Sequence, residues 1–134
     1  MLLEHQGGVP KQAASFEDVE TALSALHPTR MSFMSLTAGD GSYVQVAGAK
    51  LRLTIEARRV QADGSFRHVV LGRPSGPTEE ISINYIGGPV TVLRREVLSL
   101  TDATLVCRTF FESHTLPVAY VLRDTTSRFR SQIG

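Results

Sequence analysis

Four histidines and one cysteine are the residues of this 134-residue chain best suited to metal binding or nucleophilic chemistry. No two histidines have the three- or four-residue spacing that lets two ligands project from one helix face toward a shared metal. A single cysteine excludes an internal disulfide and every multi-cysteine metal site. We therefore predict neither a metal nor a cofactor. The residues concerned are His5, His27, His68, His114 and Cys107.

His68 has the most interesting position among the histidines, because it is expected near the middle of a strand, next to Arg67. A pocket near His68 would indicate a small-molecule-binding or catalytic α+β domain, which we keep as the alternative function. Cys107 lies on the inner stripe of a predicted helix, a position that favours an inert buried thiol. Nucleotide, phosphate-loop and serine-hydrolase motifs are absent from the sequence. The sequence therefore favours a protein without enzymatic activity.

Arginine is the most distinctive charged residue, since all but two of the fourteen basic residues are arginines. Its planar fork binds carboxylates and stacks on rings, so it is enriched at interfaces. We predict a partner-binding site on the outward face of the sheet; the alternative is a solvated face with cross-strand ion pairs. A formal net charge of +1 gives no electrostatic case for binding nucleic acid or membrane. The predicted site residues are Arg52, Glu56, Arg58 and Arg67.

A run of strands between residues 31 and 73 must position these side chains. Two Asp-Gly pairs, Asp40-Gly41 and Asp63-Gly64, mark tight turns within it, because both residue types tolerate the backbone of hairpin loops. Between the turns the sequence alternates, so that apolar residues face the core and the residues between them face solvent. The predicted inward residues are Leu51, Leu53, Ile55 and Ala57.

Two amphipathic helices are predicted, over residues 16–27 and 100–114. Each begins with a Ser-x-x-Asp capping box, at Ser15 and at Ser99. A second hairpin is predicted where Gly87-Gly88-Pro89 joins two strands, and a last strand is predicted at Val118–Leu122. The predicted order along the chain is helix, strands, helix and strand. Because this order lacks βαβ alternation, it implies an α+β fold. We expect a mostly antiparallel sheet of about six strands with both helices packed on the face that bears the inward residues.

The chain length fits one domain. We predict a flexible N-terminal tail at residues 1–14, a single α+β domain at 15–123 and a polar C-terminal tail at 124–134. No apolar run approaches the roughly 20 residues that a bilayer helix needs. The first residues have neither a basic nor a sustained apolar segment, so the chain does not resemble a secreted precursor. We therefore expect a cytoplasmic protein.

The segment Gly41–Gly48, the helix before it and the strand Leu51–Arg58 with its central Glu56 together resemble a family of bacterial proteins. These are α+β immunity proteins encoded beside polymorphic toxins. The resemblance implies a small non-catalytic protein that inhibits a cognate toxin, encoded by a neighbouring gene, through direct protein–protein contact. It carries no site residues with it. Self-association through the same sheet, giving a homodimer, is the alternative within the binding class.

Overall fold

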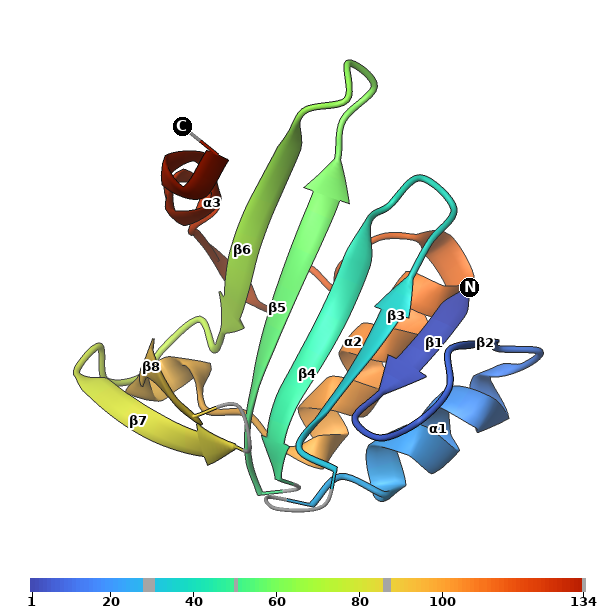
Figure 1. Ribbon diagram of the computed structural model, residues 1–134. Coiled ribbons are helices and arrows are strands. Elements are labelled where there is room, and N and C mark those ends of the chain that lie inside the picture. Colours follow the sequence, from blue (N-terminus) through green and yellow to red (C-terminus); the bar gives the residue numbers. More distant parts are fainter. Residues whose placement is uncertain (28–30, 50, 86–87, 134) are drawn as a thin grey trace.

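The computed structural model describes residues 1–27, 31–49, 51–85 and 88–133, and it shows a twisted antiparallel sheet flanked by helices (Figure 1). Within these residues the main sheet has seven strands in the order β2-β1-β3-β4-β5-β6-β9, and each neighbouring pair is antiparallel. This confirms the predicted α+β class. The strands are β1 (Leu2–His5), β2 (Lys11–Gln12), β3 (Phe33–Thr37), β4 (Tyr43–Ala49), β5 (Arg52–Val60), β6 (Phe66–Gly72) and β9 (Val121–Asp124).

Both predicted helices form, and their capping boxes are the reason they begin where they do. Asp18 accepts a hydrogen bond from the Ser15 N–H at 3.4 Å, and Asp102 accepts one from the Ser99 N–H at 3.0 Å. The first helix ends at Ser24 rather than at residue 27. The helical segments are α1 (Phe16–Ser24), η1 (Arg94–Glu96), α2 (Leu100–Ser113) and α3 (Thr126–Ile133).

The second predicted hairpin also forms. Strand β7 (Glu80–Tyr85) pairs with β8 (Gly88–Leu93) in a separate two-stranded sheet. The turn predicted at Gly87–Pro89 includes residue 87, which lies outside the described residues. In Figure 1 this hairpin lies across one end of the main sheet, on the side opposite α1 and α2.

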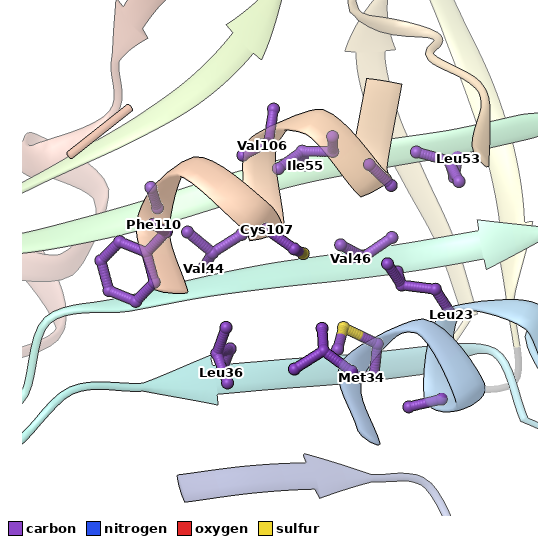
Figure 2. Close-up of a cluster of buried hydrophobic side chains, with 14 of the residues drawn as sticks. Leu23, Met34, Leu36, Val44, Val46, Leu53, Ile55, Val106, Cys107 and Phe110 are labelled. Carbon is purple, nitrogen blue, oxygen red and sulfur yellow. The ribbon is translucent and has the colours of Figure 1, made fainter. Parts of the chain in front are cut away.

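The hydrophobic core lies between the main sheet and the helices α1 and α2, as predicted. Figure 2 shows side chains of both helices meeting the inward residues of β3, β4 and β5. Leu53, Ile55 and Ala57 are buried, which confirms the alternation along β5. Leu51 was expected in the same row but is 85% exposed, because β5 begins only at Arg52. Cys107 is buried in this core, as predicted, and burial raises the pKa of its thiol to about 12, which disfavours the reactive thiolate.

The two predicted tails are corrected by the structure. Leu2–His5 pairs with β3, and Leu3 is only 1% exposed. Four residues are too few for a pattern of alternation to be recognised in the sequence, so the prediction of a flexible segment at 1–14 was wrong. At the other end, residues 124–134 contain α3, and the last strand lies at Val121–Asp124, later than predicted. No helix in the described part of the chain combines the length and apolar composition needed to cross a membrane.

The outward face of the sheet, predicted to be exposed to solvent, is partly covered by other elements. The β7–β8 hairpin lies over one part of it and α3 over another (Figure 1). Thr54 and His68, which alternate with core residues and therefore point to this face, are both buried. The helices are thus divided between the two faces, with α1 and α2 on one and α3 on the other.

Candidate functional site

The four residues predicted to form a partner-binding site do not share one face. In the register of β5 and β6, Arg58 lies opposite His68, and Arg59 lies opposite Arg67. Successive side chains of a strand point to opposite faces. Arg67 therefore projects on the helix side of the sheet, whereas Arg58 projects on the outward side. The prediction that Arg67 joins Arg52, Glu56 and Arg58 was wrong.

The loop between β5 and β6 explains this error. The N–H of Gln61 donates to the carbonyl of Ser65 at 2.7 Å, and the N–H of Gly64 donates to the carbonyl of Gln61 at 3.0 Å. Three residues therefore form the loop, and Gly64 adopts the left-handed conformation (φ 86°) typical of such loops. If the Asp-Gly pair formed a two-residue loop, the register would shift by one residue. Such a shift moves every side chain of β6 to the other face.

The remaining predicted residues are spread along β5. Arg52 is exposed at the start of the strand, and Glu56 is half-buried in its middle. Arg58 lies six residue steps along the strand from Arg52, a distance of about 20 Å. The guanidinium of Arg58 packs over aromatic rings, 4.1 Å from the ring centre of Phe66 and 5.3 Å from that of Phe129. The structure therefore makes Arg58 a packing residue of the outward face.

His68 is the centre of the contact between β6 and α3. Its Nδ1 lies 2.9 Å from Thr125 Oγ1, and its backbone N–H donates to Thr126 Oγ1 at 2.9 Å. The Phe129 ring covers the imidazole, with the two ring centres 4.1 Å apart. The Nε2 lies 4.0 Å from Glu56 Oε2, which is too far for a hydrogen bond. The structure thus brings His68 and a carboxylate together, but beneath α3.

Burial sets the charge states of this pair. Burial, together with the positive charges of Arg58 and Arg128, lowers the pKa of His68 to about 4, against the opposing effect of Asp124. Burial also raises the pKa of Glu56, although Arg128 and Arg123 partly offset the effect. Near neutral pH the imidazole is therefore uncharged and is held as part of the packing between strand and helix.

A hollow of about 360 Å³ lies on the helix side of the sheet, where α2 ends and β5 and β6 continue. We call it the arginine hollow. Its polar rim includes Arg59, Arg67, His114 and Asp40. Its volume is at the lower end of the range for ligand sites, which is about 300 to 1,000 Å³. The apolar residues that line it are Ala57, Val60, Val69, Phe110, Leu116 and Leu122.

Charged side chains of both signs surround the arginine hollow. Of the arginines in its lining, Arg58 projects to the outward face, which leaves Arg59 and Arg67 on the helix side together with Asp40. Arg59 and Arg67 lie directly opposite each other on neighbouring strands, an arrangement of like charges that opposes folding. Arg67 pairs with Asp124 at 2.9 Å, and Arg59 forms no ion pair with any residue that the structure describes. Sequence reasoning missed Arg59, because only the register shows which arginine faces Arg67.

Two carboxylates with little exposure anchor the chain segments that follow α2. Asp102, at the start of α2, accepts hydrogen bonds from the Tyr120 hydroxyl at 2.7 Å and from Arg73 at 2.8 Å. Glu96 accepts two hydrogen bonds from Arg123, at 2.7 and 2.8 Å. These contacts hold the loop after α2 and strand β9 against the rest of the fold. The same segments contain Leu116 and Leu122, which line the hollow.

Among the described residues, no group of three or more His, Cys, Asp or Glu side chains is arranged to hold a metal ion. Comparison with known proteins found no family model that matches the chain and no matching curated protein.

The opposed arginines give a test of stability. Arg59→Glu places a carboxylate opposite Arg67, and we expect it to raise the free energy of unfolding by about 0.5 kcal/mol in urea denaturation. Arg52→Glu is the matched control, because Arg52 is also exposed on β5 but lies opposite Ala49. Equal effects of the two substitutions would show that the opposed arginines carry no electrostatic cost.

His68 gives a test of pH dependence. An unfolded histidine has a pKa of about 6.5, so the unfolded chain binds the proton first. As the pH falls from about 6.5 to about 4, protonation of His68 in the unfolded chain therefore lowers the free energy of unfolding, by roughly 3 kcal/mol in total. The raised pKa of Glu56 acts in the opposite direction, so His68 should be followed directly by NMR titration of its ring protons. Titration near pH 6.5 would contradict the buried, neutral imidazole.

Proposed function

We propose that the protein is a non-catalytic binding protein that recognises a folded protein partner at the arginine hollow. The observation that carries this proposal is the mixture of groups at this end of the sheet. An apolar floor, arginines and exposed apolar side chains lie together there. Protein interfaces have this composition, with buried apolar anchors, enriched arginine and a polar rim.

Exposed apolar residues extend the surface beyond the hollow itself. Val118 is fully exposed in the loop that follows α2, and Leu122 on β9 is 44% exposed. Single exposed apolar residues are common and need no explanation. Here, however, Val118 lies in the same connection as Leu116, and both Leu116 and Leu122 line the hollow. Leu116, Leu122 and the arginines therefore line one hollow, and Val118 follows Leu116 by two residues in the same connection.

The alternative, a catalytic or small-molecule pocket near His68, has less support. His68 does not line the arginine hollow, and the ring of Phe129 covers it. Its uncharged imidazole is a hydrogen-bond partner of Thr125 in the contact with α3. A general base needs access to a substrate within hydrogen-bond reach. The observed packing favours a structural role for His68.

The partner that we propose is a toxin encoded by a neighbouring gene. This identity rests on the resemblance of the central strands to immunity proteins. An inhibitor of this kind holds a folded partner through an interface of about 800 Å² on each side, with a few residues supplying most of the affinity. The proposed site of action is the cytoplasm, where such a toxin would otherwise act on its own cell.

The proposal is tested by co-purification with the protein encoded by the neighbouring gene, followed by calorimetry. We expect a complex, and we expect the double substitution Val118→Ser and Leu122→Ser to weaken it at least about tenfold, or 1.4 kcal/mol. Serine removes apolar area without changing charge, so the effect isolates the apolar part of the surface.

Leu51→Ser is the control, because Leu51 is exposed at the opposite end of β5. It should leave the affinity unchanged. A complex that resists the double substitution but is weakened at Leu51 would place the interface at the other end of the sheet. Absence of any complex would contradict the proposed partner.

A further inference from the structure

The arginine hollow contains cationic groups that the fold leaves incompletely neutralised. Arg59 and Arg67 are cross-strand neighbours, and Arg59 has no ion pair within the described residues. The ion pair of Arg67 with Asp124 is solvent-exposed, since the two side chains are 64% and 45% exposed. Exposed pairs contribute little to stability. A second carboxylate could therefore join or replace Asp124 at low cost.

We propose that the arginine hollow binds a carboxylate side chain of the partner protein, held between Arg59 and Arg67, with an adjacent apolar side chain against the floor. The existence of a protein partner rests on the proposed function, whereas the chemistry of the site rests on the hollow itself. Arginine forks match the geometry of carboxylates and form short, charge-assisted hydrogen bonds with them. The anchor is thus an Asp or Glu next to an aromatic or aliphatic residue.

The composition of the hollow favours this ligand over others. Arg59 lies opposite Arg67 and has no ion pair within the described residues, and Asp40 already accepts a hydrogen bond from the Ser42 N–H at 2.8 Å. A cationic ligand would meet these two arginines directly. A phosphate of nucleic acid would also suit the arginines, but the apolar lining residues that remain accessible, Leu116 and Leu122, offer nothing to a sugar–phosphate backbone. Both features fit one acidic and one apolar side chain.

Asp124 acts as an internal substitute for the ligand, because it already pairs with Arg67. Its other oxygen accepts a hydrogen bond from the Thr126 N–H at 2.8 Å, at the start of α3. Asparagine is an equally good residue at such a position, so Asp124→Asn should preserve the helix start while releasing Arg67. Removal of this competing carboxylate should strengthen binding of an acidic ligand.

The probe is a pair of matched peptides, N-acetyl-Phe-Glu-amide and N-acetyl-Phe-Gln-amide, titrated into the full-length protein up to about 10 mM and followed by NMR, a range that detects affinities near 1 mM. We expect the Glu peptide to shift the amide signals of residues 57–61 and 67–69 saturably. The double substitution Arg59→Ala and Arg67→Ala should weaken this binding at least tenfold, or 1.4 kcal/mol. Asp124→Asn should strengthen it at least about twofold, through the loss of a competing charge. Arg52→Ala, the control, should change nothing.

Three results would overturn the proposal. They are equal shifts with the Gln and Glu peptides, binding of the Glu peptide that survives the loss of both arginines, and the absence of any shift at the highest peptide concentration. The spectra also show whether each variant is folded.

Failure of this inference is distinguishable from failure of the proposed function. If a complex with the protein encoded by the neighbouring gene forms but substitution of Arg59 and Arg67 leaves its affinity unchanged, only the carboxylate anchor is contradicted. Carboxylate-dependent peptide binding without such a complex supports the site and overturns the proposed partner.

Discussion

The length of α2 relative to the strands beneath it is the constraint from which the candidate site follows. At 14 residues the helix spans about 21 Å, whereas the nine residues of β5 span about 30 Å. The helix starts near Leu53, since Leu98 just before it pairs with that residue, and it ends at Ser113, where His114 adopts a left-handed conformation. The far end of β5 and the start of β6 therefore project beyond the core (Figure 1).

The charged groups at this uncovered end differ from the two most buried carboxylates of the described structure. Those carboxylates are paired: Glu96 binds Arg123 through two hydrogen bonds, and Asp102 joins Arg73 and Tyr120. At the hollow, by contrast, two arginines face each other across neighbouring strands. Local rules of folding are commonly broken where a protein uses the residues for another purpose. The opposed arginines are therefore more informative about function than the buried His68.

Much of the fold could be predicted from local signals, but the site depended on one residue of register. The helices were recognisable because Ser15 and Ser99 begin capping boxes, and β5 because its apolar residues alternate. The loop before Ser65 could contain two or three residues, and only the folded chain shows that it contains three. The length of this loop sets the register of β6 and therefore the face on which Arg67 lies. Strand β1 and helix α3 were missed because neither has enough apolar residues for a period, so tertiary contacts decide their structure.

We propose that the end of the sheet beyond α2 is the surface that meets a partner. Hydrogen–deuterium exchange of the protein alone and with the protein encoded by the neighbouring gene tests this proposal, because amide protection reports the covered surface. We expect slower exchange in the complex at residues 58–67 and 114–122, with β1 unchanged. Protection confined to the outward faces of β3 and β4, or to the β7–β8 hairpin, would contradict it.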